Sequence, residues 1–278
     1  MKKIFLIIYI FLFCQSAYAL EFVELKSKSD IVVVKLMFRN GSICDPKGKE
    51  GLTMLTVNTI MDGGVNNMSS SEVKDFTYPM AAAYYGTVDK QVSILTFKVH
   101  KQLMPKFYDL IKGFLLAPRF DTEDFERTKS NQLNFVEQVI KTSSDEEFSK
   151  MALEDFLFRG TNMQSMTMGT SSGIKSITVD DVKSHFNKFF TTANLTIGLA
   201  GDYDPILVKN MRQDLTQMSR EEPPVPAAGA AISASGLEIE IIQKPGALGS
   251  AVFTGFPLSV TRKDNDFAAL MIANSWLG

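Results

Sequence analysis

Apolar residues follow two different spacings along the chain, and together these spacings predict a protein with both helices and strands. Short apolar runs that end in turn residues predict strands over residues 30–42, 91–100 and 193–203. Stretches with apolar residues three and four positions apart predict helices instead. These helices cover residues 52–61, 69–80, 103–118, 121–141, 144–160, 177–190 and 204–218.

Polar residues at the predicted helix ends support this assignment. A serine followed three positions later by Glu72 is typical of a helix start, and Thr178 occupies the capping position before the helix of residues 177–190. The acidic runs Asp145–Glu147 and Asp180–Asp181 also fall at helix starts, where negative charge complements the helix dipole. We therefore interpret these carboxylates as structural.

The chain changes character after residue 220. Residues 221–236 are rich in Pro, Ala, Gly and Ser and show no apolar period, which is typical of a linker. Residues 237–247 then alternate apolar and charged positions, which predicts a further strand. The predicted organisation is one domain over residues 20–220, the linker, and the beginning of a second domain over residues 237–278.

The second domain repeats the start of the first. When the chain is shifted by 215 residues without a gap, Val34–Asn40 falls on Gly249–Gly255, with Phe38 on Phe253. The same shift places Leu52–Gly63 on Phe267–Gly278. A linker between two copies of one unit is typical of a duplicated domain, so we expect this chain to be part of a protein of roughly 420–460 residues.

Residues 1–19 have the three parts of a secretory signal peptide. Lys2 and Lys3 precede the apolar run of residues 4–13, and residues 17–19 give the small-x-small pattern of a cleavage site. The alternative, a membrane anchor, needs about 20 apolar residues, and this run is too short. We expect export to the periplasm of a Gram-negative bacterium.

Composition and charge narrow the classes of partner. Of the 278 residues, 45% are apolar and 22% are charged, and the formal charge of −2 predicts no nucleic-acid-binding face. Cleavage of the signal would leave 27 basic and 31 acidic residues and one cysteine, Cys44, so no intrachain disulfide is expected. No later segment is long and apolar enough to span a membrane, so no stable span is predicted after cleavage.

Three segments resemble a known family of zinc peptidases. They are GSICDPKGKEGLTMLTVNTIMDGG (residues 41–64), APRFDTEDFERTKSNQL (117–133) and MGTSSGIKSITVDDVKSHFNKFFTTANLTIGLAGDYD (168–204). Their order and spacing resemble the pitrilysin/insulinase family, which includes the mitochondrial processing peptidases. The resemblance implies an α+β pitrilysin-like metallohydrolase domain with an antiparallel sheet packed by helices, followed by a second homologous domain that closes over peptides.

The resemblance also locates the positions of the metal ligands. Family members carry an H-x-x-E-H motif on the helix after Gly-Leu, and a glutamate on the later long helix completes the zinc site. In this chain those positions hold Met54, Val57 and Asn58, and only Glu137 is a candidate for a surviving ligand. A catalytic zinc takes about three protein ligands, so neither bound zinc nor any other cofactor is expected.

The spacing of the helix predicts packing in place of chemistry. Met54, Val57 and Met61 share one helical face, which is apolar, and we interpret Met54 as a core residue. His100 and His185 have no partner at metal-ligand spacing, and Cys44 has no base near it in the sequence. We expect these three residues to be packed or solvated.

The leading hypothesis is a non-catalytic member of this family that binds or encloses extended peptides beside an active zinc-peptidase homologue. A peptide would add to a sheet edge, near the helix of residues 52–61 and the strand of residues 91–100. One alternative is a stand-alone periplasmic protein for peptide binding or assembly. A weaker alternative is an active zinc peptidase whose ligands lie elsewhere in the chain.

Overall fold

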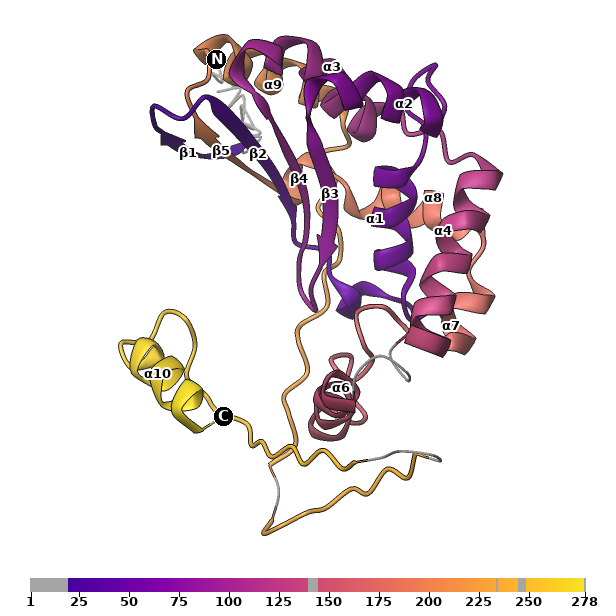
Figure 1. Cartoon of the computed structure of the whole chain (residues 1–278), viewed down its shortest axis with the longest axis vertical. Coiled ribbons are helices and arrows are strands. Elements are labelled where there is room, and N and C mark those ends of the chain that lie inside the picture. Colours follow the sequence, from indigo (N-terminus) through magenta and orange to yellow (C-terminus); the bar gives the residue numbers. More distant parts are fainter. Residues whose placement is uncertain (1–19, 140–144, 234, 245–248, 278) are drawn as a thin grey trace, which may run out of the picture.

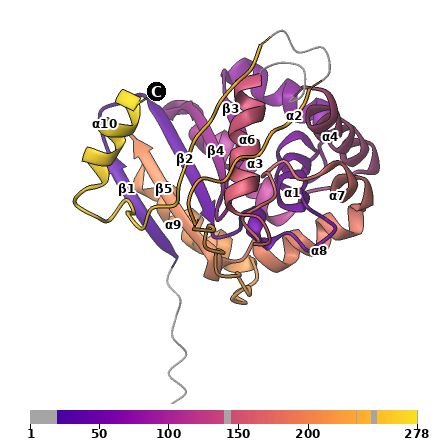
Figure 2. The same cartoon turned by 90° about the horizontal axis from the view of Figure 1, so that it is seen from below.

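The computed structural model describes residues 20–139, 145–233, 235–244 and 249–277 (Figure 1). Its centre is a five-stranded sheet with the order β1-β5-β2-β4-β3. The strands are β1 (Glu21–Lys26), β2 (Ile31–Phe38), β3 (Ala83–Val88), β4 (Ser93–His100) and β5 (Leu195–Gly201). Figure 2 shows the sheet from below, with β1 at the edge far from the helices around α1.

The strands pair antiparallel, with one exception. β2 pairs antiparallel with β4 and β5, and β3 pairs antiparallel with β4, whereas β1 lies parallel to β5. Helices α1, α3 and α9 pack on one face of this sheet. The helices of the described residues are α1 (Leu52–Asp62), α2 (Ser70–Thr77), α3 (Met104–Leu116), α4 (Thr122–Asn134), α6 (Asp145–Leu157), α7 (Ser171–Ser176), α8 (Val179–Phe189), α9 (Pro205–Asp214) and α10 (Phe267–Leu277), of which α6 and α10 lie away from the sheet (Figure 1). The predicted α+β class is confirmed.

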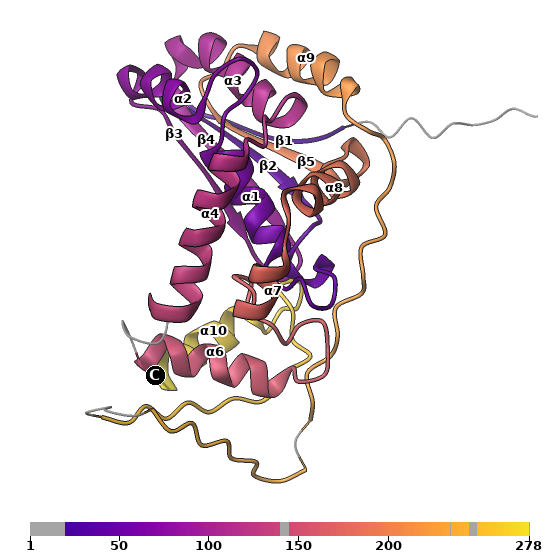
Figure 3. The same cartoon turned by 90° about the vertical axis from the view of Figure 1, so that its right-hand side faces the viewer.

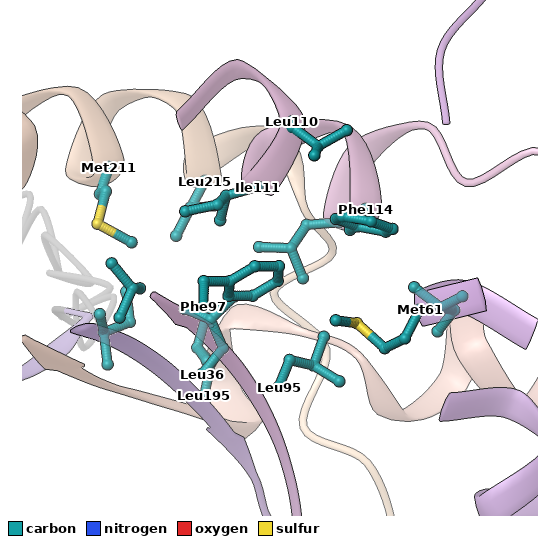
Figure 4. Close-up of a cluster of buried hydrophobic side chains, with 14 of the residues drawn as sticks. Leu36, Met61, Leu95, Phe97, Leu110, Ile111, Phe114, Leu195, Met211 and Leu215 are labelled. Atoms are coloured by element: carbon teal, nitrogen blue, oxygen red, sulfur yellow. The ribbon is translucent and has the colours of Figure 1, made fainter. Parts of the chain in front are cut away.

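The core lies between the inner face of the sheet and helices α1, α3 and α9 (Figure 4). Alternate residues of β2 and β4 point inward, among them Leu36, Leu95 and Phe97, all fully buried. The ring of Phe97 packs against that of Phe114 from α3, with 5.8 Å between ring centroids. The apolar side chains of the predicted strands and of the predicted helices thus pack together in one core.

Caps and helix ends follow the sequence closely. Ser69 and Glu72 form a reciprocal capping box at the start of α2, and Thr178 forms one with Asp181 at the start of α8. The long helix predicted over residues 121–141 is α4, which continues as a π-helical turn over Phe135–Val139. Within the described part of the chain, no helix combines the length and the hydropathy that a membrane crossing needs.

The C-terminal segment differs from its prediction. Residues 237–244 form no strand, so the strand predicted over residues 237–247 is wrong in its described part, and residues 249–255, which align with the strand of residues 30–42, form no strand either. A strand needs a neighbour for its backbone hydrogen bonds, and no strand of the sheet lies alongside this segment. The segment that aligns with the helix of residues 52–61 is helical and forms α10, and none of its side chains is buried. The linker touches α6 instead, where Ile232 N donates to Leu157 O at 2.8 Å.

Gly86 allows the edge strand β3 to approach α1 closely. A Cβ atom at Gly86 would lie 2.1 Å from Cγ1 of Val57 and 3.3 Å from Cγ of Met61. The first distance is far below van der Waals contact, and the branched side chain of Val57 has few alternative rotamers. The absence of a side chain at Gly86 therefore fixes the separation of helix and strand.

We predict that Gly86→Ala lowers the free energy of unfolding by about 1–3 kcal/mol, because the added methyl overpacks the interface with Val57. Urea denaturation of the purified protein measures this loss. Gly198→Ala is the matched control, since a Cβ there would lie 3.6 Å from its nearest neighbour, the Cβ of Lys35. The double variant Gly86→Ala/Val57→Ala should recover part of the stability. Equal effects of the two glycine substitutions would contradict the prediction.

Candidate functional site

The site is built on α1, which is buried on three sides. Figure 3 shows the helix between α4 and α8, and its remaining contacts are with β3 and β4. Within the helix only Met54 and Asn58, both half-buried, and Asp62, which is exposed, remain accessible. These three residues are spaced four apart and form one row along the helix, here called the accessible row.

The contacts of α1 show which direction the accessible row faces. Val57 packs against β3 at Gly86, and Thr59 Oγ1 lies 3.2 Å from Thr128 Oγ1 of α4. Thr53 Oγ1 lies 3.1 Å from His185 Nε2 of α8, on a further side of the helix. With 3.6 residues per turn, Met54 and Asn58 occupy the arc between β3 and α4. The accessible row therefore lies beside the free edge of β3.

The predicted motif positions separate into two environments. Met54 is half-buried in the accessible row, so its assignment to the core is wrong. Val57 is fully buried against the sheet. Asn58 is half-buried and shares the row with Met54. A thioether and an amide at these positions do not form a zinc site, and the aliphatic side chain of Val57 cannot take a proton from water.

Glu137 lies in the π-helical turn that follows α4. Its Oε1 accepts hydrogen bonds from Ser171 Oγ and, at 2.6 Å, from Lys175 Nζ, both on α7. Five residues earlier, Gln132 Nε2 donates at 3.0 Å to the carbonyl oxygen of Gly51, the residue before α1. Glu137 is thus placed beyond the first turn of α1 and is engaged with α7.

The donor set of the described residues does not fit zinc. The described ranges contain no group of three or more His, Cys, Asp or Glu side chains that could hold a metal ion. The accessible row provides the thioether of Met54, the amide of Asn58 and the carboxylate of Asp62. Val57, which faces the sheet, has an aliphatic side chain. No catalytic step through a metal follows from these residues.

A buried carboxylate holds the first turn of α1. Gly51 adopts a left-handed conformation with φ of +102°, and Asp45 supplies the cap that this glycine lacks. Oδ2 of Asp45 accepts from Gly51 N at 2.7 Å, and Oδ1 accepts from Thr53 N at 2.7 Å and from Thr53 Oγ1 at 2.6 Å. Burial raises the pKa of Asp45 to about 6, although these hydrogen bonds act in the opposite direction.

His185 completes this buried network from α8. Its Nε2 lies 3.1 Å from both Asn40 Oδ1 and Thr53 Oγ1. Both contacts suit an imidazole that carries its proton on Nε2, since Asn40 Oδ1 and Thr53 Oγ1 can each accept a hydrogen bond. Burial lowers the pKa of His185 to about 3, so the imidazole is neutral near neutral pH. The residue joins the loop after β2 to α8 and has no access to a substrate. Its burial depends on a contact across 132 residues, which no local signal in the sequence could have shown.

The remaining candidates are the thiol of Cys44 and the imidazole of His100. Cys44 is buried, and burial raises the pKa of its thiol to about 11, so it is not a thiolate near neutral pH. His100 ends β4, and its Nδ1 accepts from Gln102 N at 3.3 Å. Neither residue lies in the accessible row.

The fold and α1 define a class of protein: an α+β domain of the zinc-peptidase type, whose motif helix has no metal ligands. The family model described as insulinase (peptidase family M16) matches residues 22–171, which is more than half of the chain. The chain belongs to the insulinase family.

Relatives with and without peptidase activity resemble the chain. It is 24% identical over 169 residues to the non-peptidase homolog YmxG of Helicobacter pylori, covering 61% of this chain and 38% of that protein. It is 20% identical over 172 residues to the beta subunit of the mitochondrial-processing peptidase of Dictyostelium discoideum, covering 62% of this chain and 36% of that one. The chain thus spans little more than a third of the length of these two relatives.

A solved structure agrees with this assignment. The inactive peptidase M16 domain from Pseudomonas fluorescens superposes with a TM-score of 0.69 at 16% identity, over 78% of this chain and 52% of that one. At this identity the superposition establishes the shared fold. Together with the non-peptidase relative and the motif helix without ligands, it supports an inactive homologue of the insulinase family.

We predict that the buried histidine makes the folded protein less stable in acid. An unfolded His185 takes up a proton below its ordinary pKa of 6.5, whereas the folded one does so only near 3. The stability that the buried, neutral His185 contributes to the folded protein is therefore fully present above pH 6.5 and is lost as the pH falls toward 3. Asp45 has the opposite effect on stability. Its pKa in the folded protein is raised from 3.8 to about 6, so the folded state takes up a proton more readily than the unfolded state and gains stability as the pH falls.

Comparison with a variant isolates the histidine contribution, since Asp45 is common to both proteins. The stability deficit of His185→Gln, measured by urea denaturation at about pH 7, should shrink at about pH 4.5. The matched control is His100→Gln, at the half-exposed end of β4. A deficit that stays constant or grows in acid would show that His185 is not buried in its neutral form.

Proposed function

We propose that the chain is an exported, non-catalytic peptide-binding member of the insulinase family that acts beside an active zinc peptidase of the same family. One observation carries the proposal: the motif helix presents Met54, Asn58 and Asp62, without metal ligands, beside a free strand edge. Such a surface has groups that contact side chains and a backbone edge that pairs with an extended chain. It has no set of side chains that could hold a metal-bound water.

Peptide binding is proposed at β3. The strand of residues 91–100, expected to offer an edge, is β4, and it is paired on both sides by β2 and β3. That expectation is therefore wrong, because a strand in the middle of a sheet has no free backbone groups. Among the strands of the described residues, β3 pairs with β4 only, so its outer backbone groups are proposed to be available for strand addition. The contact of β3 with α1 would place an added peptide against the accessible row.

The partner and the compartment are also proposals. The processing-peptidase relative is a beta subunit, which supports a family member that works in an assembly. The predicted signal peptide lies outside the described residues. Cleavage after Ala19 would leave β1 whole, because that strand begins at Glu21. Purified mature protein, used as bait in a periplasmic extract, tests for a captured homologue with an intact H-x-x-E-H motif. Capture of no such homologue would favour a stand-alone peptide-binding protein.

We predict that the purified protein retains well under one equivalent of zinc per chain after dialysis against trace zinc, because no three described side chains converge on a metal. Elemental analysis measures the metal. Glu137→Gln is the informative variant, and wild-type protein with added chelator is the control. One equivalent of zinc that is lost in Glu137→Gln would establish a metal site at that residue and would overturn the non-catalytic proposal.

We predict that extended peptides bind through their backbone. A fluorescent peptide of about eight residues, N-methylated at alternate positions on one edge, should lose most of its affinity because methylation removes the N–H donors that pair with β3. The same peptide methylated on the opposite edge is the matched control. Fluorescence anisotropy gives both affinities. Equal binding of the two methylated peptides would exclude strand addition.

A further inference from the structure

We propose that the accessible row selects extended peptides in which an apolar side chain is followed, four residues later, by a basic one. Met54 would contact the apolar side chain and Asp62 the basic one. This inference rests on the proposed peptide binding at β3 and adds the class of peptide that binds. It follows from the order of the row, its spacing and its charge.

The spacing of the row matches a β-strand. Met54 and Asp62 are eight residues apart on α1, which corresponds to about 12 Å along the helix axis. An extended peptide rises about 3.3 Å per residue, and side chains on one face recur every second residue. Two side chains on the same face and four residues apart are therefore separated by about 13 Å. Such a pair matches the two ends of the accessible row.

The direction of β3 sets the order of the two side chains. Burial raises the pKa of the Tyr84 phenol, near the start of the strand, and the Asp62 carboxylate adds to this shift, whereas Gly86 faces Val57 and Met61. β3 thus runs antiparallel to α1. A peptide that pairs antiparallel with β3 runs from the Met54 end toward the Asp62 end. The apolar residue comes first in such a peptide, and the basic residue follows it.

The chemistry of the row differs from one end to the other. Met54 is flexible and polarizable, so it adapts to apolar side chains of different shapes. Asn58, between the two ends, has both donors and an acceptor for a peptide group. Asp62 supplies negative charge at the end of the helix. An acid is unfavourable there for the helix itself, because the helix C-terminus already carries partial negative charge.

The carboxylate of Asp62 is available to a ligand. None of the ion pairs among the described residues includes it. The nearby Arg127 is already engaged, since its guanidinium donates to Asp124 Oδ1 at 2.5 Å and to the backbone oxygen of Asp62 at 2.8 Å. Loss of surrounding water raises the pKa of Asp62, against the opposing effects of Arg127 and Lys74. A basic side chain would give this partly dehydrated carboxylate an ion-pair partner.

Three labelled peptides on a common alanine–threonine background test the proposal by fluorescence anisotropy. The first carries leucine followed four residues later by arginine, the second has these two residues exchanged, and the third replaces arginine by glutamine. We expect the first peptide to bind about fivefold more tightly than the other two, which corresponds to an exposed ion pair worth up to about 1 kcal/mol. Raising the salt concentration should reduce this preference.

The variant Asp62→Asn should abolish the preference and leave the fold intact, because Arg127 binds the backbone oxygen of Asp62 and, among the described residues, no ion pair uses the Asp62 side chain. The matched control Asp180→Asn removes one negative charge from α8, far from the row in sequence, and should leave the preference unchanged. If the three peptides bind wild type equally, or if Asp62→Asn keeps the preference, the proposed selectivity is wrong although peptide binding stands. If none of them binds, the proposed function fails and the selectivity fails with it.

Discussion

The packing of α1 between the sheet, α4 and α8 is the constraint on which the rest of the domain depends. A helix buried on three sides can present only one row of side chains, and here that row is Met54, Asn58 and Asp62. The missing side chain at Gly86 sets the distance to β3, and the contact of Thr59 with Thr128 sets the distance to α4. The strand edge and the accessible row are therefore carried by regular elements, whose relative positions are more precise than those of loops.

The N-terminal end of α1 is held by polar contacts in addition to the apolar packing of Leu52 and Leu55. Asp45 accepts hydrogen bonds from two backbone N–H groups of the first turn, and Thr53 links this carboxylate to His185 on α8. Both ionisable groups lie away from water, and burial shifts their pKa values in the directions that favour neutral forms. A network of this kind fixes the position of the helix, because moving α1 would leave buried polar atoms without partners.

The sequence predicted the fold well, since local spacing determines it, and predicted the site only in part. β2, β4 and β5 each lie between two other strands, and their apolar patterns are strong enough to predict them. β1 and β3 lie at the edges of the sheet, and their weaker patterns gave no prediction. The spacing of Met54, Val57 and Met61 correctly grouped them on one side of α1. It could not show that the sheet ends at β3, which leaves Met54 half-buried while Val57 is fully buried. The burial of His185 likewise depends on contacts distant in sequence.

The side chain at position 57 connects the expected lack of catalysis with the close packing of α1 against β3. Val57 is fully buried against the sheet, at the position where the resemblance to the family predicts the catalytic base. A carboxylate there would need water, a metal or a hydrogen-bond donor, since an unpaired buried charge is strongly unfavourable. An aliphatic side chain needs none of these and lets β3 and α1 meet directly. The groups left facing outward are a thioether, an amide and a carboxylate. An aliphatic side chain at position 57 therefore lets the helix and the edge strand pack without a buried charge, beside the surface at which peptide binding is proposed.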